Sequence, residues 1–453
     1  MKELGQVFTP NFIVEKMLNL SDFDYNFSDI KILEPSFGEG VFLMHIIERI
    51  IINGRKALKT DSQICDILSN NIYGVELDEK VFNKALINIK NLLEKYSLPG
   101  NLKLHLYNED FLDFNKEKDF DYIIGNPPYI RIHNIDSNTR KKIKDYKFST
   151  GNTDLYIIFF EKCINLLEKS GKLIFITPNS YIRNSSQKTF RSFLAENKLI
   201  NKIIDFGSNK IFTNADTYTA ITFLEKDNTK ASFIYERNDG LLKLSEKEIS
   251  FSANDWFLNS DASKKLSDIC SIQYGFATNA DKIFIKDEFE NIEKDILKDI
   301  VKGSRIDTCK TQKVIFPYKK KDEKYIPFTE EELKNNFPKA YEYLYKHQKE
   351  LENRSLEKNT PWFCFARSQS IQMVDSKKLV LKHILGNEEY VTYKIVDEGT
   401  CVYSGIYITA QDFASVEKVI KTKQFCTFLK ENGKDMSGGY KSFNTKLVKN
   451  FNI

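Results

Sequence analysis

The stretch Asp121-Tyr122-Ile123-Ile124-Gly125-Asn126-Pro127-Pro128-Tyr129 governs how the rest of this sequence is interpreted. Its first half is a short apolar run that predicts a buried strand, and Gly125 with two prolines ends that strand at Asn126. Proline has no N–H and a fixed φ, so Pro127 and Pro128 hold the following backbone rigidly. The pattern predicts a strand that presents an amide, a rigid carbonyl group and an aromatic ring at its carboxyl end.

These groups suit a ligand that carries an exocyclic amino group on a heteroaromatic ring. Such an NH2 group is a poor nucleophile because its lone pair is delocalised into the ring. If the Asn126 amide oxygen and the Pro127 carbonyl oxygen each accept one of its hydrogens, the nitrogen is pushed toward tetrahedral geometry. Tyr129 would stack on the ring, as pockets for extruded bases require. The alternative is a strand that ends in a Pro-Pro turn, with Tyr129 as ordinary packing.

Length and composition are typical of a soluble protein with two or three domains. The chain has 453 residues, of which 41% are hydrophobic and 29% charged, which is too long for one compact core. No apolar run is long enough to cross a bilayer, and the amino terminus does not resemble a signal peptide. The seven cysteines are scattered without a C-x-x-C pair. We therefore expect a reduced, cytoplasmic environment and no structural zinc.

A glycine-containing turn follows an earlier predicted strand. Lys31 to Glu34 predicts a short strand, which is followed by Pro35-Ser36-Phe37-Gly38-Glu39-Gly40 and an apolar helix from Val41 to Ile52. A strand, a glycine turn and a helix form the first unit of an open parallel α/β sheet, where ligands bind beyond the carboxyl ends of strands. The glycines would let the backbone approach a cofactor, and Glu34 would receive a cationic or hydroxyl group. The third glycine of the dinucleotide fingerprint is missing, as is the Lys-Ser or Lys-Thr pair of a phosphate loop.

Acidic residues end the next two predicted strands. Ile72 to Asp78 predicts a strand that ends near Glu76, whose carboxylate would bind ribose hydroxyls. After a strand over Leu102 to Tyr107, Asp110 would accept from an adenine amino group and Phe111 would cover the adenine. Strands that alternate with helices predict a doubly wound α/β sheet of seven strands. We therefore predict a catalytic domain over residues 1–235 and a mixed α+β domain over residues 236–453.

A basic stretch lies in the second predicted domain. Between Lys294 and Lys324, basic residues outnumber acidic ones and aromatic residues are interleaved, although the net charge of the chain is only +4. This pattern is typical of a surface that follows phosphate groups. The alternative is a solvated charged face. The candidate contacts to nucleic-acid phosphates are Lys302, Arg305, Lys319, Lys320 and Lys321.

A further motif lies at the amino terminus. Gly5-Gln6-Val7-Phe8-Thr9-Pro10 precedes an amphipathic run from Phe12 to Leu18. Thr9 is predicted to cap this helix and Pro10 to be its first residue. The capping interpretation alone assigns no function to the segment.

Taken in order, these motifs resemble those of the γ class of DNA N6-adenine methyltransferases, over residues 1 to about 228. The matching segments are Gly5 to Pro10, Glu34 to Gly40, Glu76, Asp110-Phe111 and Asn126 to Tyr129. The resemblance implies S-adenosyl-L-methionine as the methyl donor. The residues that it assigns to this cofactor are Thr9, Glu34 and Ser36 at the amino acid end, Glu76 at the ribose, Asp110, Phe111 and Phe159 at the adenine, and Gly38, Gly40 and Leu77 beside them.

The resemblance also implies that the substrate is an adenine flipped out of double-stranded DNA. Asn126 and Pro127 would hold its amino group, Pro128 would keep the motif rigid, and Tyr129 would stack on the base. Phe212 matches a family aromatic residue that packs against the flipped base, although the family's lysines are missing from the loop Thr213 to Asp216. Leu266 to Ile285 and Ile300 to Arg305 resemble the target-recognition domain.

The resemblance therefore predicts a site-specific adenine N6 methyltransferase of a bacterial restriction-modification or epigenetic system. We expect a monomeric, cytoplasmic enzyme without a metal, acting on nucleoid DNA alongside a separately encoded restriction endonuclease. One alternative is a methyltransferase with the same motif that acts on RNA or on a glutamine in a protein. Another is a catalytically idle DNA-binding subunit. We do not expect a fused nuclease, because the chain begins directly with the Thr9 segment and no paired-acid and lysine site is evident in the second half.

Overall fold

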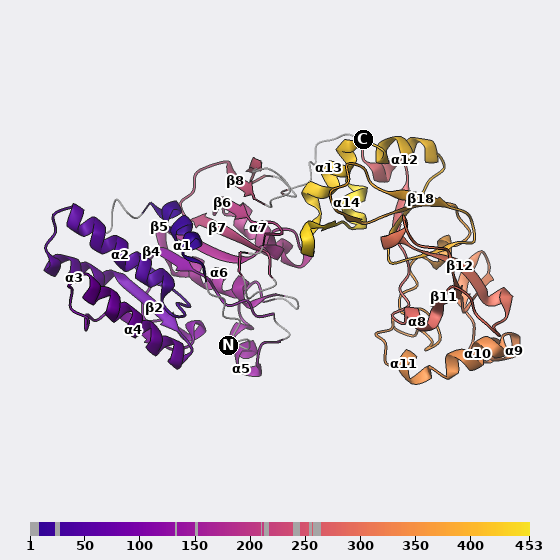
Figure 1. The fold of residues 1–453 in the computed structure, drawn as a ribbon, viewed down its shortest axis with the longest axis horizontal. Helices are drawn as coiled ribbons and strands as arrows, with labels where there is room; N and C mark the ends of the chain where they lie inside the picture. The colour runs from indigo at the N-terminus through magenta and orange to yellow at the C-terminus, as the bar shows by residue number, and fades with distance from the viewer. Residues whose placement is uncertain are drawn as a thin grey trace. The chain divides into compact units, whose positions relative to one another are not determined.

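The chain divides into two compact units, Met1–Trp256 and Phe257–Ile453. The computed structural model describes residues 9–22, 28–131, 134–149, 153–209, 211–212, 217–238, 245–252, 256 and 264–453. Figure 1 shows the first unit in indigo to magenta and the second in orange to yellow. Each unit has its own sheets and its own hydrophobic clusters.

The first unit is built on a nine-stranded sheet with the order β3-β2-β1-β4-β5-β7-β6-β8-β9. The five strands from β3 to β5 are parallel neighbours, and β7 runs antiparallel between β5 and β6. The predicted α/β fold with a large central sheet is thus confirmed. The strands are β1 (Ile32–Glu34), β2 (Ile72–Glu76), β3 (His105–Asn108), β4 (Phe120–Gly125), β5 (Leu167–Pro178), β6 (Ile200–Asp205), β7 (Thr219–Glu225), β8 (Ser232–Arg237) and β9 (Ser245–Ser250).

The sheet has two more strands than the sequence predicted. β8 pairs in parallel with β6, and β9 continues antiparallel to β8. Both strands therefore belong to the first unit, which reaches Trp256, whereas the predicted domain boundary lies after residue 235. Within the parallel part of the sheet, the strand order reverses between β1 and β4, because β1 has β2 on one side and β4 on the other. Ligands of open α/β sheets bind at such a switch point.

Helices cover both faces of this sheet (Figure 1). Alternate residues of β5 face opposite ways: Ile174 and Ile176 join the core formed with α1 to α4, whereas the Phe175 ring packs against Phe160 of α6. The helices of the first unit are α1 (Asn11–Ser21), α2 (Val41–Lys56), α3 (Asp61–Asn71), α4 (Glu79–Lys95), α5 (Ser137–Ile143), α6 (Leu155–Leu166) and α7 (Lys188–Glu196). No helix in the described part of the chain combines the length and the apolar character needed to cross a membrane.

The second unit is a mixed α+β domain, as predicted. One four-stranded sheet has the order β10 (Ser271–Tyr274), β20 (Ile406–Thr409), β16 (Lys378–Leu381), β18 (Tyr393–Val396), and the other β11 (Ile285–Lys286), β13 (Gln312–Ile315), β12 (Leu297–Lys302), β19 (Cys401–Tyr403). The smaller sheets consist of β14 (Tyr318–Lys321) with β15 (Lys324–Pro327), and of β17 (Ile384–Leu385), β22 (Lys441–Ser442) and β21 (Lys434–Asp435). The helices are α8 (Asp281–Phe284), α9 (Glu330–Asn336), α10 (Pro338–Tyr345), α11 (Gln348–Glu352), α12 (Phe413–Ile420), α13 (Lys423–Asn432) and α14 (Thr445–Lys449).

Candidate active site

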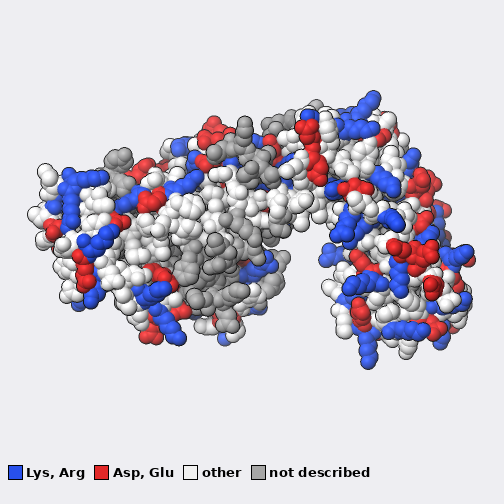
Figure 2. Space-filling view, in the orientation of Figure 1, with Lys and Arg blue, Asp and Glu red and all other residues white. Residues whose placement is uncertain are grey.

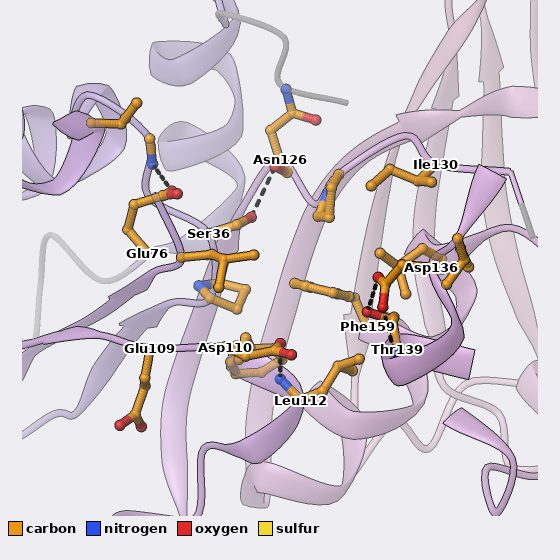
Figure 3. Close-up of a pocket in the computed structure, with 18 of the residues that line it drawn as sticks. Ser36, Glu76, Glu109, Asp110, Leu112, Asn126, Ile130, Asp136, Thr139 and Phe159 are labelled. Carbon is orange, nitrogen blue, oxygen red and sulfur yellow. Dashed lines mark hydrogen bonds between the residues drawn. The ribbon is translucent and has the colours of Figure 1, made fainter. Parts of the chain in front are cut away.

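A cavity of about 340 Å³ lies beyond the carboxyl ends of β1, β2, β3 and β4, at the switch point of the sheet (Figure 3). Its walls come from the segments that follow these strands and from α5 and α6. The predicted site residues that line it are Ser36, Gly38, Glu76, Leu77, Asp110, Phe111, Asn126, Pro128 and Phe159. Those that lie outside its lining are Thr9, Glu34, Gly40, Pro127, Tyr129 and Phe212.

The two glycines of the turn after β1 have different roles. Both have positive φ, 55° at Gly38 and 85° at Gly40, a conformation that glycine adopts without strain. A Cβ atom at Gly38 would meet nothing within 4 Å, whereas one at Gly40 would lie 3.3 Å from the Cβ of Ala85 on α4. Gly38 therefore opens the cavity to a ligand, and Gly40 begins α2 and packs against α4.

Two buried glutamates end the strands β1 and β2. Glu76 lines the cavity, and its carboxylate accepts hydrogen bonds from the backbone N–H groups of Gly38 and Asp78, both at 2.9 Å. Glu34 is 2% exposed and accepts from the N–H of Leu43 at 3.1 Å. Burial raises the pKa of Glu76, and it raises the pKa of Glu34 well above its usual range, with a contribution from the Glu76 charge. Glu76 is thus an oriented acceptor at the cavity, while Glu34 lies behind the turn.

Asp110 places a carboxylate above an apolar surface. It caps the short helix η3 (Phe111–Asp113), because Oδ1 accepts from the N–H of Leu112 at 2.9 Å (Figure 3). The ring of Phe111 lies against that of Phe159, with centroids 5.0 Å apart. Leu77 lines the same cavity although 56% of its surface is exposed. This arrangement suits a purine ring with an amino group.

Two hydrogen bonds tie the Asn126 segment to the rest of the site. The Ser36 hydroxyl donates to the Asn126 carbonyl oxygen, and the Asn126 amide nitrogen donates to the Thr9 hydroxyl oxygen, each at 3.1 Å. The prediction that Thr9 caps α1 is wrong. Pro10 occupies the N-cap position, and Thr9 contacts Asn126 instead. Gly5 to Phe8 lie outside the described residues.

Tyr129 and Phe212 lie together beside the motif. The Tyr129 hydroxyl donates to the Ile176 carbonyl oxygen at 3.2 Å. The two rings have centroids 6.2 Å apart and an interplanar angle of 73°, and Phe212 is 2% exposed. Burial raises the pKa of Tyr129 well above its usual range, so its hydroxyl is a neutral donor rather than a base. The loop Thr213 to Asp216 lies outside the described residues.

The sequence interpretation did not assign the wall that α5 contributes. Asn134, Ile135, Asp136 and Thr139 line the cavity. Asp136 caps α5 by accepting from the N–H groups of Asn138 and Thr139 at 2.8 and 3.0 Å. The signal for this helix was present, because Asp136 followed by a polar turn is an N-cap pattern. Nothing local indicates that the helix faces the ends of β3 and β4.

The predicted DNA contacts lie in the second unit, where Figure 2 shows Lys and Arg interspersed with Asp and Glu. Lys319 pairs with Glu332, and Lys320 pairs with Glu323 and Asp375 at 3.2 and 3.1 Å. The Lys302 ammonium lies 5.5 Å from the centre of the Tyr403 ring. Arg305 and Lys321 are exposed and have no ion-pair partner among the described residues.

Metal binding is not indicated by the described residues, in which no group of three or more His, Cys, Asp or Glu side chains is arranged to hold an ion. The site instead consists of oriented acceptors, an apolar surface and the Asn126 segment. These groups bind, orient and desolvate a ligand.

Known proteins share this combination of sequence and fold. The sequence model of the Eco57I restriction-modification methylase family matches residues 56–212. The chain is 27% identical to the type II restriction enzyme and methyltransferase RM.Eco57I of Escherichia coli, over 88% of this chain and 51% of that protein. It is 27% identical to the type II methyltransferase M.BstVI of Geobacillus stearothermophilus, over 79% of this chain and 73% of that protein. The type IIL restriction-modification enzyme MmeI, solved in complex with DNA, has a similar fold, with a TM-score of 0.67 and 14% identity, over 97% of this chain and 64% of that chain.

The chain spans about half the length of RM.Eco57I, and the likeness to MmeI shows the fold alone. The matches nevertheless confirm the resemblance that the motifs carry, and they imply S-adenosyl-L-methionine as the cofactor. By sequence, this chain is similar to methyltransferases of restriction-modification systems.

Proposed function

We propose that this chain is a site-specific DNA methyltransferase that transfers a methyl group from S-adenosyl-L-methionine to the N6 amino group of an adenine. The observation that carries the proposal is the position of Asn126. It lines the same cavity as Gly38, Glu76 and Asp110, and hydrogen bonds to Ser36 and Thr9 hold it there. The hydrogen-bond acceptors proposed for the cofactor, Glu76 and Asp110, and the acceptor proposed for the target amino group, Asn126, thus line one cavity.

The cavity fits the cofactor in size and chemistry. Its volume of about 340 Å³ is within the range of small-molecule sites. A carboxylate has about four lone-pair positions, so Glu76 can accept from ribose hydroxyls in addition to the two N–H groups that orient it. Asp110 would accept from the adenine amino group, and Leu77, Phe111 and Phe159 would enclose the ring. Ser36 and Gly38 would lie at the amino acid end.

The bound cofactor supplies an electrophilic methyl group on a sulfonium. The protein's part is to place the attacking nitrogen in line with it, and such positioning accounts for much of the rate of a displacement. The Asn126 amide oxygen and the Pro127 carbonyl oxygen would accept the two hydrogens of the target amino group. The bond to Thr9 orients the amide. Tyr129 would stack on the base, and because its hydroxyl stays protonated, it does not act as the base.

Duplex DNA can present this amino group only if the adenine leaves the stack. The edge-to-face contact between Tyr129 and Phe212 differs from a pair of parallel rings with a base between them. Binding of the base would therefore turn or displace the Phe212 ring. We assign target recognition to the second unit, with Arg305 and Lys321 as the best-placed phosphate contacts, and we place the enzyme in a restriction-modification system with a separately encoded endonuclease.

The test is transfer of a labelled methyl group from S-adenosyl-L-methionine to mixed-sequence duplex DNA, RNA or a protein extract, followed by analysis of the labelled nucleoside or amino acid. Label is expected in N6-methyladenine from DNA. Asn126→Ala should reduce turnover by about 100-fold or more, since misplacing a reacting group has a cost of this order. Binding of S-adenosylhomocysteine should change little.

Asn83→Ala is the matched control, because Asn83 is exposed on α4 and lies outside the cavity lining. It should methylate DNA at the wild-type rate. Retained turnover in Asn126→Ala would contradict the role of the amide. Label in RNA or in a glutamine would support the proposed cofactor site and contradict DNA as the substrate.

A further inference from the structure

We propose that Lys142 is a positioning residue of the cofactor site, which holds Asp110 in the orientation that accepts the adenine amino group. This inference rests on the proposed function, because it concerns the same cavity. Lys142 lies near the end of α5, and its ammonium is 2.5 Å from Asp110 Oδ2 and 2.6 Å from Asp113 Oδ2. It is the link between α5 and η3, two of the segments that form the cavity wall.

The two oxygens of Asp110 are held from different directions. The Leu112 N–H donates to Oδ1 at 2.9 Å, and Lys142 donates to Oδ2. Each oxygen of a carboxylate has two lone pairs, so both bonds can persist while Asp110 accepts a hydrogen from a ligand. Without Lys142, the bond from the Leu112 N–H is the one hydrogen bond that the described residues still donate to this carboxylate.

The environment keeps this contact ionic. Lys142 and Asp110 are each 22% exposed, so water competes less for them than for an exposed pair. The hydrogen bonds from Asp110 and Asp113 raise the pKa of Lys142, and the ammonium therefore keeps its charge at neutral pH. Bonds between charged partners are stronger than neutral ones. An oriented Asp110 acceptor is what a weak donor such as an adenine amino group requires.

The contact also fixes the opposite wall of the cavity. Thr139 precedes Lys142 by three residues, so both lie on the same side of α5. Thr139 and Asp136 line the cavity. The ion pair therefore holds this side of α5 against η3, with the Asp110 carboxylate between the two segments.

An ordinary structural ion pair would have a different signature. If Lys142 only stabilised α5, its loss would reduce the affinity for every ligand of the cavity by the same factor. If Lys142 competed with the ligand for Asp110, its loss would tighten binding. If it positions Asp110, its loss weakens only those ligands that carry the amino group.

The experiment measures calorimetric binding of two ligands to the full chain. One is S-adenosylhomocysteine, and the other is its analogue in which hydrogen replaces the adenine amino group. Lys142→Met should reduce the affinity for S-adenosylhomocysteine by about 10-fold or more, the size of effect expected for a hydrogen bond to a charged group. The same substitution should reduce the affinity for the analogue by less than about 3-fold. Lys142→Arg should restore most of the affinity, and Asp113→Asn, which keeps the Asp110 contact, should stay near wild type.

Equal losses for the two ligands, or tighter binding of S-adenosylhomocysteine, would overturn the inference and leave the proposed cofactor site standing. Lys142→Arg retains a cation, so it tests the inference even if Lys142→Met folds poorly. A wild-type chain that binds neither ligand would overturn the proposed function, and this inference with it.

Discussion

Charged side chains are placed differently in the two units. In the first, Glu34, Glu76 and Asp205 are the last residues of β1, β2 and β6, and all three are buried. In the basic stretch of the second, Lys319 and Lys320 remain partly exposed and are paired with acidic residues of the same surface. Burying a charge is expensive unless it is paired or hydrogen-bonded, whereas a surface ion pair contributes little to stability.

This difference separates positions that must be fixed from positions that can vary. The buried carboxylates are held by bonds to specific donors, so a substitution there changes the geometry of the strand ends. Asp205, for example, accepts from Asn179 and Gly207 at 2.8 and 2.9 Å. A surface of exposed charges tolerates exchange without a change of fold.

The largest effect is expected from the buried ion pair at the end of β6. Arg237 is 2% exposed, and its guanidinium lies 3.4 Å from Asp205 Oδ2. Burial would raise the pKa of Asp205, but the charges of Arg237 and Arg183, together with hydrogen bonds from Tyr235 and Asn179, lower it. Arg237→Ala should therefore reduce the free energy of unfolding by about 3 kcal/mol, as removal of one partner of a buried pair does.

The sequence provides a reporter for each unit, because its two tryptophans are Trp256 and Trp362. Urea unfolding of Arg237→Ala followed by Trp256 fluorescence, with Trp362→Phe as the background, measures the first unit. Lys320→Ala with the reporters exchanged measures the second, and should change stability by no more than about 1 kcal/mol. Equal losses of stability in the two experiments would contradict the expected difference between the two units.

The burial of Glu34 predicts a pH dependence of the stability of the first unit. The pKa of Glu34 is raised by burial, so above a pH of about 4.3 the unfolded chain loses this proton more readily than the folded chain. Stability should fall as the pH rises from there through the folded-state pKa. In Glu34→Gln this part of the fall is absent, while Leu43 can still donate to an amide oxygen. Thermal unfolding of both chains at pH 4.5 and pH 8 measures the difference, and identical pH dependence would contradict it.

The smallest effects are expected on the surface of the second unit. Arg305→Ala and Lys321→Ala should each reduce the slope of log K against log salt for duplex DNA by about 1. Lys319→Ala and Lys320→Ala should change it less, because both ammonium groups are paired with acidic residues. Fluorescence anisotropy with a mixed-sequence duplex provides the slopes. Four unchanged slopes would identify the stretch as a solvated charged face.

Much of the sheet was predictable because its signals are local. Apolar runs that end in Glu34, Glu76 and Gly125 are strands of the structure. The two added strands were not predicted, because an alternating pattern indicates a strand but not its partner. β8 pairs directly with β6, although β7 lies between them in the sequence. The helix α3 was also missed, although Thr60 and Gln63 form a capping box at its start.

The individual residues of the site were predictable, but the contacts that they make with distant parts of the chain were not. Glu76, Asp110 and Asn126 were each identified from the end of a strand, and they line one cavity. The contact of Asn126 with Thr9 joins residues 117 positions apart, and that of Lys142 with Asp110 joins residues 32 apart. Local patterns contain no information on such pairs. Thr9 shows the consequence, because a capping signal was assigned to a residue that is used elsewhere.

We propose that Asn126, at the end of β4, directs methylation to adenine N6 in DNA. The most direct measurement is modification-sensitive sequencing of DNA from cells that express the wild-type chain, Asn126→Ala or Asn83→Ala in a host without its own adenine methylation. We expect N6-methyladenine at one recurring sequence in cells with the wild-type chain or Asn83→Ala, and none with Asn126→Ala. Unmodified adenine with the wild-type chain, or the same modification with Asn126→Ala, would contradict it.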